Sequence, residues 1–326
     1  MPDIVVLREA DVRAALDLPS LIEAMGEALD AYSAGRAELP SVIHLGVPES
    51  GGEVHVKAGH LHGAPRYAVK VSSGFYAAAP PAIDGLVVVF DASDGAPVAF
   101  LLDRGYLTDA RTGAAGGLAA RHLAPAEVGT VAVIGTGAQA RWQLRSLACV
   151  RRFERVRVWG RNAEHVERCL RDLEGESLAA SKLEAAVGVE EAVLGADVVI
   201  TCTASTDPLV RAEWVSPGTH VTAVGSDGPD KRELDVAVLG RADVLVVDSR
   251  DQCARFGELH HALDAGAVVS ADDAVELGDV VAGRRPGRTS AEQITVCDLT
   301  GVGVQDVAAA ALALERAPAT AETIRI

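Results

Sequence analysis

The chain has 326 residues, of which 49% are hydrophobic, and it carries a formal net charge of -16 at pH 7. This length predicts about two domains, and the apolar content is ample for buried cores. The acidic balance argues against nonspecific binding to nucleic acid or to an anionic membrane, because both require a basic protein surface.

Targeting and metal-binding signals are missing from the sequence. Residues 1–7 have neither a charged segment nor a long apolar segment, and no later window offers about 18 uninterrupted apolar residues, so a cytoplasmic protein is expected. The five cysteines are scattered without a C-x-x-C pair, which argues against disulfides and a zinc knuckle. His55, His60 and His62 are close in sequence, but no carboxylate in ligand spacing accompanies them, and no metal is expected.

The first 125 residues mix helical and strand patterns. A helix is expected at about residues 18–35 and a second at about 108–123. Between them, turn residues separate four short strand patterns, near 54–58, 67–72, 85–91 and 97–103.

From residue 128 onward, strand and helix patterns alternate. Five apolar strands are expected, at 131–134, 156–159, 198–203, 220–224 and 244–248. Such alternation is typical of a doubly wound parallel sheet. A last helix, at about 304–316, is expected to pack back on the first domain. The sequence thus predicts an α/β protein with a Rossmann domain at 126–303 and a discontinuous α+β domain made of 1–125 and 304–326.

The segment VAVIGTGAQA at residues 131–140 has the pattern of a dinucleotide pyrophosphate site. Gly135 permits a tight turn, Gly137 lets the backbone approach a phosphate, and Ala140 lets the helix pack closely on the strand. A strand precedes the glycines and a helical pattern follows them, as the motif requires; an ordinary strand-to-helix turn is the alternative. The expected cofactor contacts are Gly135, Thr136, Gly137, Ala138, Gln139 and Ala140.

The end of the second expected strand bears on which dinucleotide is bound. An NAD site usually has an acidic residue there for the ribose 2′-hydroxyl, and the segment Val158–Asn162 has none. Arg161 can pair with a 2′-phosphate instead. The pattern favours NADP(H), with a solvent-facing Arg161 and NAD(H) held by backbone contacts as the alternative.

Several segments, spread in order over nearly the whole chain, resemble the ornithine cyclodeaminase and mu-crystallin family. They are YAVK at 67–70, LTDARTGAA at 107–115, the Gly135 loop, VGSDGPDKREL at 224–234 and TGVGVQD at 300–306. The family includes NAD(P)-dependent cyclodeaminases, archaeal-type alanine dehydrogenases, and imine or ketimine reductases. The resemblance implies a homodimer built from a substrate-binding and dimerisation domain plus a Rossmann domain, acting on a small amino or imino acid.

The resemblance also implies roles for particular residues. Arg111 would bind the substrate carboxylate with its guanidinium fork, and Lys70 would contact the same carboxylate or pass a proton. Asp227 matches the acid/base aspartate of the cyclodeaminase and alanine dehydrogenase branches. A solvent-exposed lysine, an ion-paired surface arginine and a turn-forming aspartate are the respective alternatives. Further cofactor-lining positions implied by the family are Thr112, Thr203, Ala204, Ser205, Val224, Gly225 and Gly301.

Three positions narrow the expected reaction. Asp227 argues against a mu-crystallin-like ketimine reductase, since those proteins lack an aspartate there. Ser41 stands where the family has an arginine, and Lys57 aligns with the glutamate that cyclodeaminases use for a substrate amine. With Lys70 and Arg111, Lys57 would form a cationic pocket suited to a second carboxylate or to a small neutral imino acid, unless a one-residue register error turns it away.

The expected function is therefore an NAD(P)-dependent oxidoreductase that interconverts a small α-amino acid and its α-imino acid by hydride transfer. Two alternatives stay open. One is a redox-neutral ornithine-type cyclodeaminase, and the other is a noncatalytic NADPH-binding protein, because a fold does not fix a function.

Overall fold

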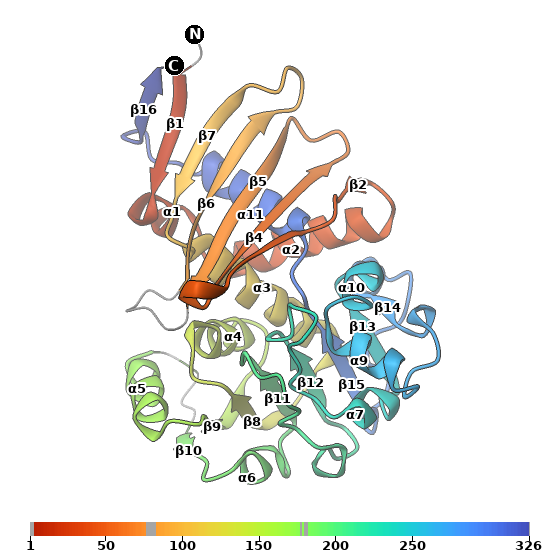
Figure 1. The fold of residues 1–326 in the computed structure, drawn as a ribbon. Helices are drawn as coiled ribbons and strands as arrows, with labels where there is room; N and C mark the ends of the chain where they lie inside the picture. The colour runs from red at the N-terminus through yellow and green to blue at the C-terminus, as the bar shows by residue number, and fades with distance from the viewer. Residues whose placement is uncertain (1–2, 76–82, 177, 179–181, 326) are drawn as a thin grey trace. The chain divides into compact units, whose positions relative to one another are not determined.

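The computed structural model describes residues 3–75, 83–176, 178 and 182–325 (Figure 1). The chain forms two compact units: unit 1 comprises Met1–Arg111 and Val302–Ile326, and unit 2 comprises Thr112–Gly301. The first boundary falls inside helix α3 (Tyr106–Leu123), whereas the sequence predicts a boundary after that helix, at residue 125. The roles of the two domains remain proposals.

Unit 1 is built around an eight-stranded sheet. Its strands are β1 (Asp3–Arg8), β2 (Ala37–Glu38), β3 (Ile43–Val47), β4 (Gly52–Leu61), β5 (Arg66–Phe75), β6 (Ile83–Asp91), β7 (Pro97–Leu102) and β16 (Glu322–Arg325). Their order is β16-β1-β7-β6-β5-β4-β2, and β3 pairs with β4 beside this path. The four expected strands are confirmed as β4 to β7, while the other four are additional.

The helices of unit 1 are α1 (Glu9–Ala15), α2 (Leu18–Ser33), α11 (Gly303–Glu315) and the 3-10 turn η1 (Pro48–Ser50). Helix α2 begins where the side chain of Asp17 accepts a hydrogen bond from the Ser20 backbone at 2.9 Å. Helix α11 packs against α2 and against β4, β5 and β6. A Cβ atom on Gly303 would collide with the carbonyl of Ala58, so glycine is required for this close approach. The helices predicted at about 18–35 and 304–316 are confirmed as α2 and α11.

Unit 2 contains a second eight-stranded sheet, in which every pairing is parallel. Its strands are β8 (Val128–Ile134), β9 (Phe153–Trp159), β10 (Lys182–Ala185), β11 (Val198–Thr201), β12 (His220–Ala223), β13 (Val244–Val247), β14 (Val275–Glu276) and β15 (Thr295–Asp298). The order β10-β9-β8-β11-β12-β15-β13-β14 begins with the 3-2-1-4-5 arrangement of a doubly wound sheet. The predicted fold class is confirmed.

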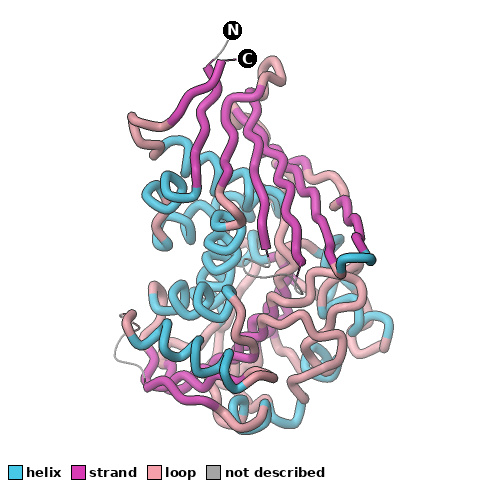
Figure 2. Tube along the Cα trace, turned by 60° about the vertical axis from the view of Figure 1, so that its left-hand side comes forward, coloured by secondary structure: helices cyan, strands magenta, loops and turns pink. Residues whose placement is uncertain are grey.

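The connections of unit 2 are mostly helical, as Figure 2 shows. They are α4 (Ala138–Ala148), α5 (Ala163–Glu174), α6 (Val189–Val193), α7 (Val236–Gly240), α8 (Arg250–Cys253), α9 (Glu258–Asp264), α10 (Leu277–Val281), η2 (Ala212–Trp214) and η3 (Ala271–Asp273). Alternate strand residues point to opposite sheet faces. Val131 and Val133 belong to one hydrophobic cluster, and Ala132 and Ile134 belong to another. Both faces are therefore covered, as parallel sheets require.

Among the described residues, no helix has the length and apolar character needed to cross a membrane.

Candidate active site

Three cationic side chains predicted to bind substrate are buried together in unit 1. Lys57 on β4 and Lys70 on β5 stand directly opposite each other in the antiparallel register, so their side chains lie on the same face of the sheet. They are 7% and 2% exposed, and Arg111 on α3 is 4% exposed. Buried cations at such density require compensating partners.

The compensating carboxylate is Asp306 on helix α11. Its Oδ1 atom accepts a hydrogen bond from Lys70 Nζ at 3.0 Å and another from Arg111 Nε at 2.9 Å. Arg111 Nη1 also donates to Gln305 Oε1 at 2.8 Å. Sequence reasoning quoted Gln305 and Asp306 within a family segment but gave them no role. Their signal was a polar pair in a helix made mostly of alanine, valine and leucine, where a buried acid needs a cation.

The charges in this cluster change the protonation of its members. Burial lowers the pKa of Lys70 to about 7, the charges of Arg111 and Lys57 add to this, and Asp306 offsets only part of the effect. Burial acts to raise the pKa of Asp306, but Arg111, Lys70 and Lys57 together hold it below its usual value. Lys70 is therefore able to exchange a proton near neutral pH.

Two buried polar atoms at this cluster lack a hydrogen-bond partner among the described residues. They are Asp306 Oδ2, an acceptor, and Gln305 Nε2, a donor. Leaving such atoms unsatisfied costs about 1–3 kcal/mol each. The cluster thus combines three cationic side chains with one open acceptor and one open donor, which fits a ligand that carries a carboxylate and a nitrogen.

In unit 2, the glycine loop follows β8 as the sequence predicts. Gly135 has φ +131°, and a Cβ atom there would lie 2.7 Å from the carbonyl oxygen and from Sγ of Cys202, so only glycine fits. Gly137 is the N-cap of α4, and a Cβ atom on it would meet no described atom within 4 Å. Ala140 is fully buried. The loop has the form expected for a dinucleotide site.

Arg141, which was not predicted from the sequence, stabilises the glycine loop by hydrogen bonds. Its Nη1 donates to the carbonyls of Thr136 at 2.9 Å and Gly137 at 3.0 Å. Its Nε and Nη2 donate to Asp172 at 2.9 and 2.6 Å, which holds the guanidinium between α4 and α5. An arginine one turn into a helix gives no distinctive signal in sequence, because most such residues face solvent.

Other predicted cofactor residues occupy helix α3 and the ends of the strands. Thr112 is half-buried on α3, and its carbonyl accepts from Gln143 on α4 at 3.0 Å. Arg161 is exposed just beyond β9. A Cβ atom on the preceding Gly160 would lie 2.6 Å from the Thr136 side chain, so this end of β9 abuts the glycine loop.

The loops after β11 and β12 touch each other. A Cβ atom on Gly225 would collide with the carbonyl of Thr203, and the backbone of Val224 donates to Thr201 O at 3.0 Å. Ala204 is exposed, and the backbone of Ser205 donates to Thr203 Oγ1 at 3.2 Å. The predicted residues of both loops therefore gather at the carboxyl ends of adjacent parallel strands, where ligands bind in this architecture.

Glu233 joins these two loops and was not predicted. Its fully buried carboxylate accepts from Thr201 Oγ1 at 2.8 Å, from Thr203 N and Oγ1 at 2.5 and 2.8 Å, and from Gly225 N at 2.8 Å. Burial raises the pKa of Glu233 to about 7, although these hydrogen bonds act in the opposite direction. A carboxyl group that accepts two backbone and two hydroxyl donors fixes the shape of both loops.

Further buried carboxyl groups lie in the same unit. Glu258 accepts from the backbone N–H groups of Glu233 at 2.7 Å and Leu234 at 3.1 Å. Burial raises the pKa of Asp298, at the end of β15, to about 7. Asp248 accepts from the backbone N–H of Gly301 at 2.6 Å, and Gly301 has φ +76°. The predicted nicotinamide-side glycine is thus held by a buried aspartate.

Asp227 belongs to unit 2 and lies in the loop after β12. Its carboxylate accepts a hydrogen bond from Lys231 Nζ at 2.7 Å, and its side chain is 36% exposed. Lys57, Lys70 and Arg111, by contrast, gather in unit 1. The structure thus brings together three of the four residues expected to act on substrate, and gives the fourth a lysine neighbour that sequence reasoning did not consider.

The chain is similar to known proteins over nearly its whole length. The model of the ornithine cyclodeaminase/mu-crystallin family matches residues 3–321. An uncharacterized cyclodeaminase of Sinorhizobium fredii is 41% identical over 324 residues, covering 97% of each chain. The alanine dehydrogenase of Archaeoglobus fulgidus is 34% identical over 313 residues, covering 96% of this chain and 94% of its own.

Three solved structures are similar to this chain over nearly its whole length. An archaeal alanine dehydrogenase dimer with bound NAD has a TM-score of 0.90 at 30% identity, with 99% of each chain covered. The Thermococcus litoralis Δ1-pyrroline-2-carboxylate reductase, in complex with NADH and L-proline, has a TM-score of 0.90 at 27% identity, covering 99% of this chain and all of its own. The iminosuccinate reductase of Paracoccus denitrificans, in complex with NAD+, has a TM-score of 0.87 at 29% identity, with the same coverage.

These matches establish the class: a nicotinamide-dependent enzyme fold of the amino-acid and imino-acid type. The chain belongs to the ornithine cyclodeaminase/mu-crystallin family, which confirms the resemblance found in its sequence.

Replacing Asp306 with asparagine should destabilise unit 1 in a pH-dependent way. Breaking a buried ion pair from one side costs about 3–5 kcal/mol. Because Lys70 is charged below a pKa of about 7, the loss of unfolding free energy should be larger at about pH 6 than at about pH 8.5. Chemical denaturation followed by circular dichroism measures both values.

The matched control for this substitution is Asp30→Asn, because Asp30 pairs with Arg36 at the surface of the same unit. Its effect should stay within about 1 kcal/mol at either pH. Equal losses at both pH values in D306N would show that Asp306 does not act on Lys70.

Replacing Glu233 with glutamine should flatten the pH dependence of stability in unit 2. The pKa of Glu233 rises from its ordinary value of 4.5 to about 7 on folding, so its contribution to stability is complete below about pH 4.5 and disappears as the pH rises through about 7. The unfolding free energy of E233Q should therefore fall less between pH 5 and pH 7 than that of the unaltered protein.

Tryptophan fluorescence is the suitable measurement, because all three tryptophans, Trp142, Trp159 and Trp214, lie in unit 2. Glu213→Gln is the control, since Glu213 is 65% exposed and should leave the slope unchanged. A slope in E233Q equal to that of the unaltered protein would rule out titration of Glu233 in this range.

Proposed function

We propose that this protein is an NAD(P)-dependent oxidoreductase that interconverts a small α-amino acid and its α-imino acid by hydride transfer. The observation that carries the proposal is the buried set of Lys57, Lys70 and Arg111 around Asp306. Family membership and the dinucleotide-type loop at Gly135 support it, because both point to a nicotinamide cofactor.

Each buried residue has a task in this reaction. Arg111, which is oriented by Asp306 and Gln305, attracts the α-carboxylate of the substrate, and Lys57 attracts a second carboxylate where the substrate has one. Lys70, with a pKa of about 7, is suited to give a proton to the substrate nitrogen or to take one from it. The bound cofactor supplies or accepts the hydride at the substrate α-carbon. The open Oδ2 of Asp306 is an acceptor for an N–H of the substrate.

The number of buried cations favours an imine with two carboxylates. Lys57, Lys70 and Arg111 are three cationic side chains that can each contact an anionic group of the substrate. A dicarboxylate engages more of these side chains than a monocarboxylate does. The terminal ammonium of ornithine would add a further cation beside Lys57, which disfavours that substrate. The relatedness of an iminosuccinate reductase is consistent with this preference.

Asp227 is proposed as a second acid/base group, on the strength of its position in the family pattern. Its carboxylate forms an ion pair with Lys231 at 2.7 Å and is 36% exposed, so it is accessible to a ligand.

For the cofactor we propose NADP(H) over NAD(H). The support is the exposed Arg161 immediately after β9, with no acidic residue in the segment Val158–Asn162. The related structures that contain NAD+ or NADH favour the opposite preference, so this part of the proposal depends on Arg161 alone.

The assembly that we propose is a homodimer, as in the related archaeal alanine dehydrogenase. Ile43 and Leu45 on β3 are 61% and 58% exposed, which offers an apolar strand face for a second copy. A cytoplasmic location, where nicotinamide cofactors are available, remains part of the proposal.

A redox-neutral cyclodeaminase is the second candidate. It is favoured by the presence of Asp227 and by the 41% identity to a cyclodeaminase of uncharacterized activity. Lys57 opposes it when the substrate carries a terminal ammonium. A noncatalytic NADPH-binding protein is the third, although such a protein has no need of a buried lysine with a pKa of about 7.

The purified protein should oxidise NADPH or NADH in a one-to-one ratio with an imino acid, fastest with a dicarboxylic one such as iminosuccinate. A panel that includes cyclic imines, followed by nicotinamide absorbance and mass spectrometry of the product, measures this. Lys57→Met should lower kcat/KM for the dicarboxylic imine by about 10- to 100-fold, because it removes one charged partner. It should change kcat/KM for a monocarboxylic imine by only about two- to threefold.

Lys182→Met provides a comparison, because it also removes a lysine charge and Lys182 is 69% exposed on β10 of unit 2. It should not alter the ratio of the two substrates. Conversion of ornithine to proline without net change of cofactor would replace this proposal with the cyclodeaminase. Cofactor binding without any turnover would favour the binding protein.

Arg161→Ala should separate the two cofactors. Loss of a charge-assisted contact to a 2′-phosphate should reduce kcat/KM for NADPH by about 10- to 100-fold and leave that for NADH within about twofold. Arg168→Ala, an exposed arginine on α5, is the control and should change neither. A parallel loss for both cofactors, or an unaltered protein that already prefers NADH, would contradict the NADP(H) proposal.

A further inference from the structure

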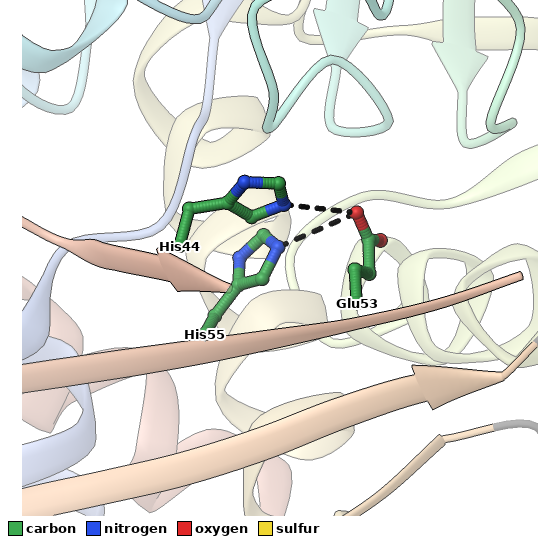
Figure 3. A group of neighbouring side chains, drawn as sticks. All are labelled: His44, Glu53 and His55. Carbon is green, nitrogen blue, oxygen red and sulfur yellow. Dashed lines mark hydrogen bonds and ion pairs between the residues drawn. The ribbon is translucent and has the colours of Figure 1, made fainter. Parts of the chain in front are cut away.

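A group of potential metal ligands lies on the β3–β4 hairpin of unit 1. His44 Nε2 is 3.4 Å from Glu53 Oε2, and His55 Nε2 is 3.5 Å from the same oxygen. The three ligand atoms lie within 4.8 Å of one another. Figure 3 shows both imidazole rings directing a nitrogen toward the carboxylate of Glu53.

The hairpin itself brings these residues together. His44 on β3 stands directly opposite His55 on β4, so the two side chains lie on the same face. Glu53 precedes His55 by two residues along β4 and therefore shares this face. The connection between the strands is closed by η1 and by Gly51, whose φ of +59° is readily adopted by glycine. The ligand positions thus follow from strand register and do not depend on a loose loop.

The two separations from Glu53 match a shared metal ion better than direct hydrogen bonds, and all three ligand atoms lie within 4.8 Å of one another. Hydrogen bonds of the N–H···O type in proteins are typically about 2.7–3.2 Å long, and both distances here exceed that range. In a tetrahedral zinc site with metal–ligand bonds of about 2.0–2.2 Å, two ligand atoms are about 3.3–3.6 Å apart. The side chain of His44 is 45% exposed, which leaves it room to adjust toward the ideal position.

His55 adds an independent observation. Its Nε2 atom is buried and has no hydrogen-bond partner among the described residues, although the cost of such an atom is about 1–3 kcal/mol. The two imidazole rings meet edge to face, with centroids 4.8 Å apart and planes at 84°. This arrangement keeps the rings from stacking and leaves both Nε2 atoms directed at one point. A bound cation would satisfy the buried nitrogen.

The other two histidines of the sequence cluster have separate partners. His60 Nε2 lies 3.3 Å from the carbonyl of Ala64, and His62 Nε2 lies 2.9 Å from Glu38. The sequence predicts no metal because His55, His60 and His62 lack a nearby carboxylate in ligand spacing. The structure groups His55 with two different residues, and one of them is a carboxylate.

We propose that His44, Glu53 and His55 bind one divalent transition-metal ion, of which Zn²⁺ is the best fit, with water completing the coordination. Two imidazoles and one carboxylate are a ligand set that suits zinc. The ion joins β3 to β4 and rigidifies the hairpin. His55 precedes Lys57 by two residues, so the site lies on the same sheet face as the cationic cluster, about 7 Å farther along the strand.

The test uses the full-length protein, freed of metal with a chelator and titrated with Zn²⁺ by calorimetry at about pH 7.5. We expect one ion per chain. His44→Ala and Glu53→Gln should each weaken binding by more than about 100-fold, since loss of outer-shell partners alone costs about 10- to 100-fold. Co²⁺ in place of Zn²⁺ should give a visible spectrum of low-symmetry coordination that these variants lose.

His62→Ala is the matched control, because His62 is a half-exposed histidine just beyond the same strand and also neighbours a glutamate. It should bind Zn²⁺ as the unaltered protein does. Circular dichroism establishes that each variant is folded, and His44 is exposed enough for its loss to be tolerated. Absence of stoichiometric binding, or equal binding by H44A and the unaltered protein, would overturn the proposal. These outcomes are independent of whether the protein reduces imines.

Discussion

The burial of Lys57, Lys70 and Arg111 around the carboxylate of Asp306 is the constraint on which the rest of unit 1 depends. Lys57, Lys70 and Arg111 come from the central strands and from α3, while Asp306 comes from a helix almost 200 residues later in the chain. Helix α11 must therefore pack against β4 and β5, and Gly303 makes this approach possible.

Unit 2 also buries ionisable side chains, but the buried groups there are carboxyl groups. Glu233, Glu258, Asp248 and Asp298 are buried at or near the carboxyl ends of the parallel strands, where their oxygens accept backbone N–H groups. Loops at this edge have few strand partners of their own, so buried carboxyl groups replace the missing hydrogen bonds. Burial raises the pKa values of Glu233, Glu258 and Asp298, and the hydrogen bonds that these groups accept fix the geometry of the loops.

Sequence reasoning succeeded where the signal is local. Hydrophobic periodicity and the placement of glycines predict the Gly135 turn, the alternating elements of the parallel sheet and helix α11. Each of these is confirmed. It failed where the partner is distant in sequence: Asp306 and Glu233 look like ordinary polar residues until the fold supplies their contacts. Arg141 was missed although it contacts Thr136 and Gly137 nearby in sequence, because an arginine in a helix gives no distinctive signal. The hairpin group was missed for the same reason, because antiparallel pairing, and not spacing, brings His44 to His55.

Strand β16 pairs with β1, and α11 lies in the same unit, so residues near both ends of the chain complete a single sheet and its covering helix. This arrangement affects the order in which the two units can fold during synthesis. Unit 2 is one continuous stretch and is able to fold while the chain is still being made, whereas unit 1 has to wait for its last helix and strand. Until then, Lys70 and Arg111 remain without their carboxylate, so the emerging N-terminal segment is the part most exposed to misassembly or to chaperone capture.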